Sequence, residues 1–242
     1  MLAPSETGQP PLSVIAVEND FVEDVYSGLS SWYDILFGPT LHAGRLAAMP
    51  KVPIGRGDEV LEVGVGTGIN ALLYRKDCRV TGVDFSASML AKARRRLDTN
   101  RVTNVCLAKM DAMDMMFEDG AFDVVYAPYV ISVVPNPVAV IREMYRVCRV
   151  GGYVVLLNHF RSTNRVAALA ERMISPLTVH IGFRSDLDLP GFLEQAQLEP
   201  ISIEKLALPK LWSLVVFRKE ALPPPAEAVP RSAPLSPHHR AL

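Results

Sequence analysis

Short apolar runs alternate along the chain with stretches that have the three-to-four-residue apolar spacing of helices. The runs long enough for one buried strand each are 60–63, 78–83, 105–110, 122–127 and 153–157. Strands that alternate with helices in this way are typical of a parallel sheet covered by helices. The pattern therefore predicts an α/β fold for the central part of the chain.

Two of the predicted helices have recognisable caps. Ser86 is the expected N-cap of a helix over 87–97, and Asn136 with Pro137 is expected to begin a helix over 137–150 that ends at a glycine pair. We interpret the basic residues of the first helix as a solvated face. These residues are Lys92, Arg94, Arg95 and Arg96.

The pattern changes near the C-terminus. Residues 201–206 and 212–219 are both predicted strands, and the five residues between them are too few for a parallel crossover but enough for a hairpin. The last strand is therefore predicted to be antiparallel. Dehydrogenase sheets of the Rossmann type are usually parallel throughout, so the hairpin argues against that class.

Composition and spacing divide the chain into four segments. Residues 1–12 contain three prolines and residues 221–242 contain six, so we expect both ends to be disordered. Residues 13–50 are predicted to form a helical cap, and 51–220 the main domain. Within the cap, 14–26 has helical apolar spacing and an acidic opposite face, which favours packing on the domain and leaves membrane contact open.

Three glycines follow the first predicted strand at alternate positions, Gly64, Gly66 and Gly68. They suit a buried strand that turns sharply into a helix, and they leave backbone N–H groups accessible to a small ligand. The dinucleotide-binding pattern needs its third glycine at the position of Ile69. A cofactor is therefore expected at this turn, and a dinucleotide is disfavoured.

Acidic residues come at the ends of the first three predicted strands, namely Glu62, Asp84 and Asp111. The carboxyl ends of parallel strands meet at one edge of the sheet, where open α/β sheets bind ligands. An acid at the end of the second strand can accept hydrogen bonds from both hydroxyls of a ribose. The alternative is that Asp84 and Asp111 only cap helices.

Composition also limits the classes of function. The 242 residues are 49% hydrophobic with a formal net charge of −1, which suits one buried core and gives no support for a nucleic-acid partner. The three cysteines lack the paired spacing of a metal site or a disulfide framework, so we expect no metal. No apolar stretch is long enough to span a bilayer, and the N-terminus lacks the features of a signal peptide. We expect a cytoplasmic protein, soluble or peripheral on the membrane.

Four motifs together resemble the class I S-adenosylmethionine-dependent methyltransferases. They are Glu62-x-Gly64-x-Gly66-x-Gly68, Asp84-Phe85-Ser86-x-Ser88-Met89-Leu90, Asp111-Ala112 and Phe117-Glu118-Asp119-Gly120-Ala121-Phe122-Asp123-Val124-Val125. The resemblance covers roughly residues 20 to 219. It implies an α/β fold with a Rossmann-like methyltransferase sheet, a terminal antiparallel hairpin and an N-terminal helical cap. It also implies S-adenosyl-L-methionine as the cofactor.

By this resemblance, the glycine loop would pass under the methionine part of the cofactor, and Glu62 would lie near its ammonium. Asp84 would hold the ribose, and Asp111 would face the adenine amino group. The residues implied for cofactor binding are Glu62, Gly64, Gly66, Gly68, Asp84, Phe85, Met89, Asp111 and Ala112. The chemistry agrees, because this cofactor has no pyrophosphate and its cationic end favours nearby carboxylates.

The segment 160–184 carries four arginines and one acid among apolar residues. Arginine suits a phosphate and apolar side chains suit lipid tails, so the segment fits a phospholipid at an anionic membrane surface; an ordinary amphipathic lid helix is the open alternative. The chain most resembles the soluble bacterial phosphatidylethanolamine N-methyltransferases, and the quinone C-methyltransferases share much of the pattern. The expected substrate-binding residues are Arg161, Arg165, Tyr129 and His180.

The expected catalytic residues are Tyr26, Tyr33, Asn158 and His159. A histidine can accept the proton that an ammonium headgroup must lose, and the other three side chains could orient the nitrogen. The alternative is that His159 is a structural residue at the end of its strand. Related phosphoethanolamine methyltransferases have a histidine after the fourth strand, but here that place reads Tyr129-Val130-Ile131-Ser132.

The expected function is therefore S-adenosylmethionine-dependent N-methylation of phosphatidylethanolamine towards phosphatidylcholine at the cytoplasmic face of a membrane. One alternative is C-methylation of a quinone precursor in the ubiquinone or menaquinone pathway. A second alternative, from another class, is a membrane-bound sensor that binds S-adenosylmethionine without turning it over.

Overall fold

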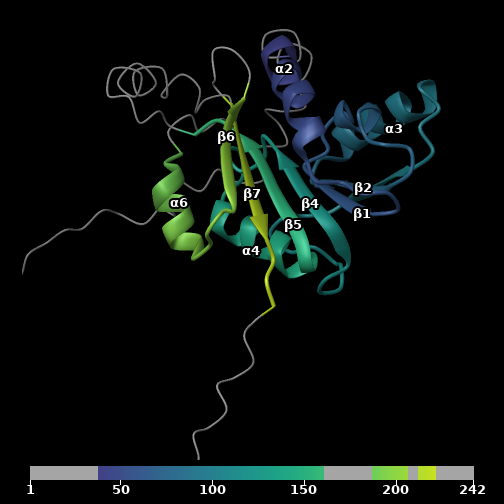
Figure 1. Ribbon diagram of the computed structural model, residues 1–242. Helices are drawn as coiled ribbons and strands as arrows, with labels where there is room; N and C mark the ends of the chain where they lie inside the picture. The colour runs from purple at the N-terminus through teal and green to yellow at the C-terminus, as the bar shows by residue number, and fades with distance from the viewer. Residues whose placement is uncertain (1–37, 161–186, 207–211, 222–242) are drawn as a thin grey trace, which may run out of the picture.

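Within residues 38–160, 187–206 and 212–221, which this computed structural model describes, seven strands form one sheet (Figure 1). The strands are β1 (Glu59–Val63), β2 (Arg79–Asp84), β3 (Val105–Lys109), β4 (Phe122–Pro128), β5 (Cys148–Asn158), β6 (Ser202–Leu206) and β7 (Trp212–Arg218). Their order across the sheet is β3-β2-β1-β4-β5-β7-β6. Strands β1 to β5 pair in parallel, so their carboxyl ends lie at one edge.

Strand β7 runs antiparallel to both of its neighbours, β5 and β6. Leu206 and Trp212 are paired at the turn end of β6 and β7, as a hairpin requires. The predicted terminal antiparallel hairpin is thus confirmed. Because β7 lies between β5 and β6, the parallel part of the sheet ends at β5.

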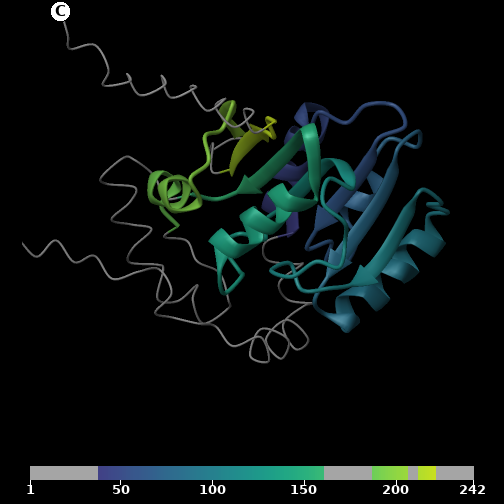
Figure 2. The same cartoon turned by 90° about the horizontal axis from the view of Figure 1, so that it is seen from below.

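Helices cover both faces of the sheet (Figures 1 and 2). The elements are α2 (Gly38–Ala48), η2 (Met49–Lys51), η3 (Asn70–Leu72), α3 (Ala87–Thr99), α4 (Pro137–Val147) and α6 (Leu189–Ala196), where η marks a 3-10 helix. Helices α4 and α6 contribute to the hydrophobic cluster on one face, and α2 contributes to the cluster on the other.

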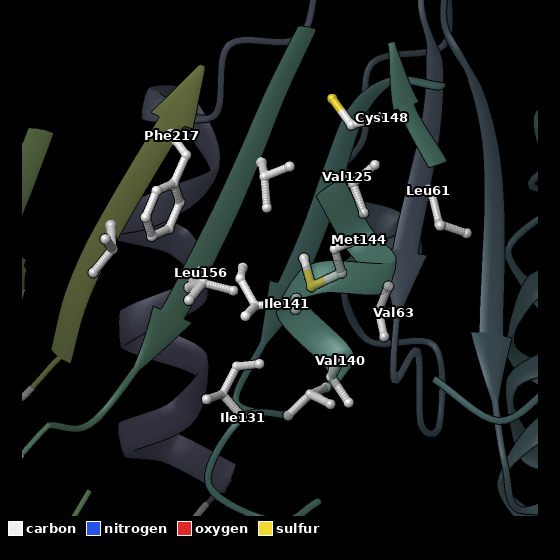
Figure 3. Packing of buried hydrophobic residues seen from close by; sticks show 14 of the residues in the cluster. Leu61, Val63, Val125, Ile131, Val140, Ile141, Met144, Cys148, Leu156 and Phe217 are labelled. Carbon is white, nitrogen blue, oxygen red and sulfur yellow. The ribbon is translucent and has the colours of Figure 1, made fainter. Parts of the chain in front are cut away.

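Alternation of side chains along each strand supplies both clusters. On β1, Leu61 and Val63 pack under α4, as Figure 3 shows, whereas Val60 packs on the face that α2 covers. Ile141 and Met144 of α4 are fully buried in the first cluster. The strands are therefore apolar on both faces, which explains why they appear in the sequence as continuous apolar runs.

Both predicted helix caps are present. The Ser86 hydroxyl accepts the N–H of Met89 at 3.3 Å at the start of α3. The Asn136 side chain accepts the N–H of Ala139 at 3.0 Å at the start of α4. Each satisfies a backbone donor that the first turn of a helix leaves unpaired.

The prediction that α4 runs to residue 150 was wrong. The helix ends at Val147, and Cys148 already has extended backbone angles and begins β5. The glycine pair belongs to the irregular start of this strand: Gly151 has φ +77°, and a Cβ on Gly152 would lie 2.6 Å from the carbonyl oxygen of Asp123 in β4. These glycines permit close pairing of two strands, and they do not cap the helix.

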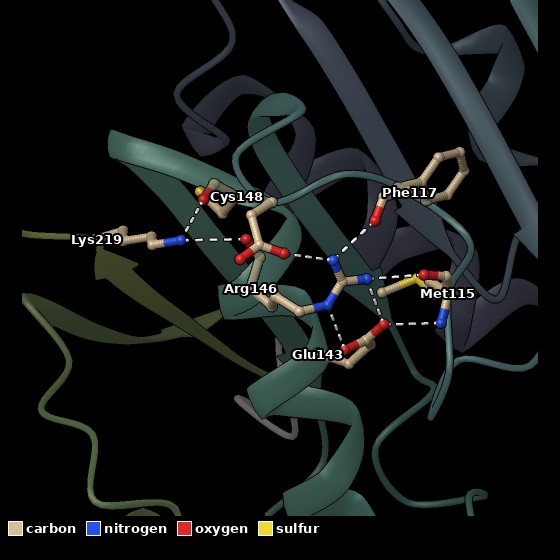
Figure 4. Close-up of polar contacts among 7 residues, drawn as sticks. Met115, Phe117, Glu143, Arg146, Cys148 and Lys219 are labelled. Atoms are coloured by element: carbon tan, nitrogen blue, oxygen red, sulfur yellow. Dashed lines mark hydrogen bonds and ion pairs between the residues drawn. The ribbon is translucent and has the colours of Figure 1, made fainter.

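Arg146 fastens α4 to the segment that leads into β4 (Figure 4). Its guanidinium donates to the carbonyl oxygens of Met115 and Phe117 at 2.7 Å, and to the carboxylates of Asp119 and Glu143, also at 2.7 Å. The carboxylate of Glu143 also accepts the N–H of Met115 at 2.8 Å. The hydrogen bond from Arg146 lowers the pKa of Glu143. The Arg146 side chain therefore donates to two backbone carbonyl oxygens that form no hydrogen bond with a neighbouring strand.

We expect Arg146→Met to lower the free energy of unfolding by about 1–3 kcal/mol, because two carbonyls and a half-buried carboxylate lose charged hydrogen bonds. Chemical denaturation measures this loss. The matched control is Arg75→Met, which removes an ion pair with Asp77 in which both side chains are about half exposed, and it should cost clearly less because exposed ion pairs contribute little to stability. Equal losses in the two variants would contradict the role given to Arg146.

Candidate functional site

The glycine loop after β1 lies at the carboxyl edge of the sheet. Gly64, Gly66 and Gly68 all have positive φ, at +69°, +54° and +74°. A Cβ on Gly64 would lie 2.2 Å from Val130, and a Cβ on Gly68 would lie 3.1 Å from Ala93. A Cβ on Gly66 would meet no protein atom within 4 Å. Two glycines are thus required by packing, and Gly66 faces open space that a ligand can enter.

The loop does not enter an α-helix, contrary to the prediction. After Gly68 the chain forms only the 3-10 turn η3 and then returns to β2. The buried side chain of Asn70, the first residue of η3, donates to the carboxylate of Glu62 at 2.9 Å. This contact draws the segment back over β1, and the few residues that remain before β2 leave no room for several helical turns.

Asp84 joins the loop to the next helix. Its carboxylate accepts the N–H of Gly66 at 2.8 Å through one oxygen and the N–H of Ser86 at 2.9 Å through the other. Burial raises the pKa of Asp84, and these two backbone donors lower it. Each carboxylate oxygen has a second lone pair. Asp84 can therefore accept two more hydrogen bonds at the end of β2, which is what a ribose with two hydroxyls needs.

Helix α3 also supports the loop through a residue whose role the sequence analysis missed. Arg96 donates to the carbonyl and to the hydroxyl of Thr67, the latter at 2.8 Å. The interpretation of the basic residues on this helix as a solvated face is therefore wrong for Arg96, although Arg94 and Arg95 are exposed. A pattern of charges cannot reveal this contact, because the two residues are far apart in the sequence.

Glu62 lies behind the loop in a buried polar cluster. Its side chain is almost fully buried, and burial raises its pKa to about 7. One carboxylate oxygen accepts from Asn70, whereas Oε2 has no partner within hydrogen-bond distance in the described part of the chain, although the nearby Tyr74 hydroxyl lowers the pKa of Glu62. The hydroxyls of Tyr74 and Tyr126 and the Oδ1 of Asn70 are also buried there and lack partners among the described residues. Burial raises the pKa of both tyrosines.

The remaining residues expected to bind a cofactor follow β2 and β3. The Lys109 ammonium lies 5.6 Å from the centre of the Phe85 ring. Met89 is buried in the first turn of α3, and Ala112 packs against the cluster under α4. Asp111 accepts the N–H of Met113 at 2.8 Å, and thus shapes the turn after β3. These residues lie on the same edge as the glycine loop, because β1, β2 and β3 are parallel neighbours.

Tyr129 follows β4 with φ +64°, an uncommon conformation for a residue with a side chain. Its hydroxyl donates to the carbonyl of Leu41 in α2 at 2.8 Å, and its ring lies edge-on to Trp212, with 4.7 Å between the ring centres. Tyr129 is buried. The hydroxyl thus helps to hold α2 on the domain, and the substrate contact expected for Tyr129 stays a prediction.

Asn158 and His159 end β5 beside this aromatic pair. Asn158 is fully buried, accepts from the Ser132 hydroxyl at 3.3 Å and donates to the carbonyl of His159 at 2.8 Å. The His159 ring is partly exposed and lies 6.2 Å from the Trp212 ring, edge-on. Asn158 therefore holds the backbone of His159, and the imidazole is the more exposed side chain of this pair.

Five candidate residues lie outside the described residues, namely Tyr26, Tyr33, Arg161, Arg165 and His180. Their roles stay predictions, as do the disorder expected for 1–12 and for the tail from 222, and the cap before residue 38. Of the predicted cap, the structure describes α2 and η2.

Among the described residues, no group of three or more histidine, cysteine, aspartate or glutamate side chains is placed to bind a metal ion. Cys78, Cys106 and Cys148 are free thiols. Among the described helices, none has the length and apolar character needed to cross a membrane.

Known proteins share both the sequence and the fold of this chain. The family described as a methyltransferase domain matches residues 61–156. A phosphatidylethanolamine N-methyltransferase of Cereibacter sphaeroides is 37% identical over 188 residues, which are 77% of this chain and 92% of that protein. A demethylmenaquinone methyltransferase of Staphylococcus aureus (strain JH9) is 30% identical over 168 residues, which are 64% of this chain and 69% of that protein.

Among solved structures, the YcgJ protein of Bacillus subtilis has a TM-score of 0.62 at 16% identity and covers 74% of this chain and 100% of its own. At this identity the likeness concerns the fold alone. The sheet with its antiparallel β7, the glycine loop and the identity over most of the chain agree with one another. The chain therefore belongs to the class I S-adenosylmethionine-dependent methyltransferases.

Proposed function

We propose that this methyltransferase methylates the amine of phosphatidylethanolamine, towards phosphatidylcholine, at an anionic membrane surface on the cytoplasmic side. The observation that carries the choice of substrate is the 37% identity to the Cereibacter sphaeroides enzyme, which extends over 77% of this chain and well beyond the shared methyltransferase domain. The site geometry supports the reaction class.

The residues at the carboxyl edge fit S-adenosylmethionine. Gly66 borders open space, Asp84 has two unused lone pairs for ribose hydroxyls, and Glu62 has an unpaired carboxylate oxygen for an ammonium. When bound, S-adenosylmethionine supplies an electrophilic methyl group on a sulfonium. The protein contributes position and the exclusion of water, which together account for much of the rate of a direct transfer.

His159 is the residue that we assign to the proton of the substrate amine. An ammonium has no lone pair, so it must lose a proton before its nitrogen can act as a nucleophile. The partly exposed imidazole stands at the end of β5, and the hydrogen bonds of Asn158 to Ser132 and to the His159 carbonyl fix the backbone that carries it. Asn158 is thus a positioning residue.

The similarity to a demethylmenaquinone methyltransferase favours a second candidate, C-methylation of a quinone precursor. The two substrates differ in chemistry. A lipid amine can be methylated repeatedly until its nitrogen is quaternary, whereas a quinone precursor takes one methyl group on an activated ring carbon. The products therefore distinguish the two functions.

The first prediction for this site concerns the glycine loop. Gly66→Ala should weaken the binding of S-adenosylhomocysteine at least about tenfold, because the new methyl group enters the space of the ligand, while the fold has room for it. Gly57→Ala is the matched control: Gly57 also has positive φ, at +81°, and a Cβ there meets no atom within 4 Å. It precedes β1 at the opposite edge. Calorimetry that gives both variants wild-type affinity would contradict the placement of the ligand.

The second prediction concerns the proton on Glu62. With a pKa of about 7, Glu62 is largely protonated at pH 6 and largely ionised at pH 8. A ligand ammonium favours the ionised form, so binding at low pH must release a proton. We expect the affinity for S-adenosylhomocysteine to rise about tenfold from pH 6 to pH 8. Calorimetry with Glu62→Gln should show a nearly flat profile; parallel profiles in both proteins would refute the assignment.

The third prediction concerns the products. With liposomes of phosphatidylethanolamine and an anionic lipid, mass spectrometry should detect mono-, di- or trimethylated amine lipids. His159→Ala should lower turnover about 100-fold and leave cofactor affinity nearly unchanged, because its role arises only in the reaction. The control His42→Ala changes an exposed histidine of α2 and should keep wild-type turnover.

Two outcomes would contradict the proposed substrate. A methylated quinone in parallel incubations with demethylmenaquinone, without any methylated amine lipid, would favour the second candidate. Binding of the cofactor without transfer to either substrate would favour the sensor.

A further inference from the structure

Helix α2 carries a basic side chain that the sequence analysis did not single out, Arg45. Its guanidinium carbon lies 4.9 Å from the centre of the Tyr129 ring, an arrangement in which the ring holds the cation in place. Its Nη1 is buried and has no hydrogen-bond partner in the described part of the chain. The guanidinium thus has an open donor that requires an acceptor.

The charge of Arg45 acts on the buried polar cluster behind the glycine loop. It favours the ionised forms of Glu62 and of Tyr126. Nevertheless, Glu62 Oε2 and Arg45 Nη1 are both without hydrogen-bond partners among the described residues. Arg45 therefore influences Glu62 electrostatically, but no hydrogen bond joins Nη1 of Arg45 to Oε2 of Glu62.

Such an arrangement is costly unless a ligand completes it. An unpaired buried polar atom destabilises a protein, and a charged one does so more strongly. A ligand with one anionic and one cationic group, held a short distance apart, would satisfy both atoms at once. The α-carboxylate and α-ammonium of an amino acid have this chemistry.

We propose that Arg45 binds the carboxylate of the amino-acid end of S-adenosylmethionine while Glu62 binds its ammonium. This inference rests on the proposed function, because it uses the same ligand. Helix α2 then contributes directly to cofactor binding, and the Tyr129 ring fixes the guanidinium that recognises the carboxylate. The pair selects an intact amino acid over any adenosyl thioether that lacks one.

The main competing ligand for Arg45 is the phosphate of the lipid headgroup. A phosphate would bring negative charge towards Glu62 without a cation directly attached to balance it. The carboxylate of an amino acid comes with its own ammonium on the same carbon atom. The charges of the site therefore favour the amino acid.

The test compares two ligands that differ only in the carboxylate. Calorimetry on the full chain measures binding of S-adenosylhomocysteine and of S-adenosylthiopropylamine, its decarboxylated analogue. The wild-type protein should prefer the first roughly 10- to 100-fold, the effect of a charged hydrogen bond. Arg45→Met should reduce the preference to within about threefold, and Arg45→Lys should restore part of it.

Arg218→Met is the matched control, because the Arg218 guanidinium also lies over a tyrosine ring, 6.0 Å from the centre of Tyr153. These residues pair in the middle of β5, at the end of the β5–β7 pairing that lies farthest from Asn158. This variant should keep the wild-type preference. If Arg45→Met does not fold, Arg45→Gln replaces it and should show the same reduced preference. The preference of the wild-type protein for S-adenosylhomocysteine is a test in its own right.

The outcomes separate this inference from the proposed function. Loss of binding of both ligands by the wild-type protein would overturn both. Binding without a preference for the carboxylate, or a preference that Arg45→Met leaves intact, would overturn only the role of Arg45. A higher KM for phosphatidylethanolamine in Arg45→Met, with the ligand preference unchanged, would assign Arg45 to the lipid phosphate instead.

Discussion

The two backbone hydrogen bonds that Asp84 accepts are the contact on which the site depends. The Asp84 carboxylate accepts the N–H of Gly66 and the N–H of Ser86. It thereby holds the glycine loop after β1 against the first turn of α3. The same carboxylate retains lone pairs for a ligand. An acid that only capped α3 would not need the contact with the loop. An acid that only bound ribose would leave the loop without this support. One side chain therefore shapes the glycine loop and also keeps acceptor lone pairs that the proposed cofactor can use.

The buried polar residues behind this loop lower the stability of the free protein. Glu62, Tyr74 and Tyr126 are buried with polar atoms that no described residue satisfies. Desolvation raises the pKa of Glu62 to about 7, so a proton can partly neutralise the carboxyl group when no ligand is present. Unpaired polar atoms stabilise nothing in the free protein, and buried groups with shifted pKa values are common at ligand-binding sites.

The other half of the site depends on rigid support from the end of the sheet. Trp212, the first residue of the antiparallel β7, packs edge-on against Tyr129 after β4 and His159 after β5. The hairpin thus does more than end the sheet, because it brings an aromatic side chain between two elements of the site. The hydrogen bonds of Asn158 add a second constraint on His159. A site built on strand ends in this way is held more precisely than one built on loops alone.

The sequence by itself determined the features that depend on neighbouring residues. Apolar runs located the strands, Ser86 and Asn136 marked the helix starts, and the short link before β7 required a hairpin. The glycines at alternate positions predicted the turn, since only glycine adopts positive φ at little cost.

Only the tertiary structure decided which distant residues meet. Arg96 is one of several basic residues on a helix until the fold places it on Thr67. Arg45 is an ordinary helical arginine until α2 packs over Tyr129. The glycine pair after α4 looks like a helix end because its true constraint, the carbonyl of Asp123, lies on another strand. In each case the deciding contact joins segments that are separated in the chain, and no local pattern of residues records it.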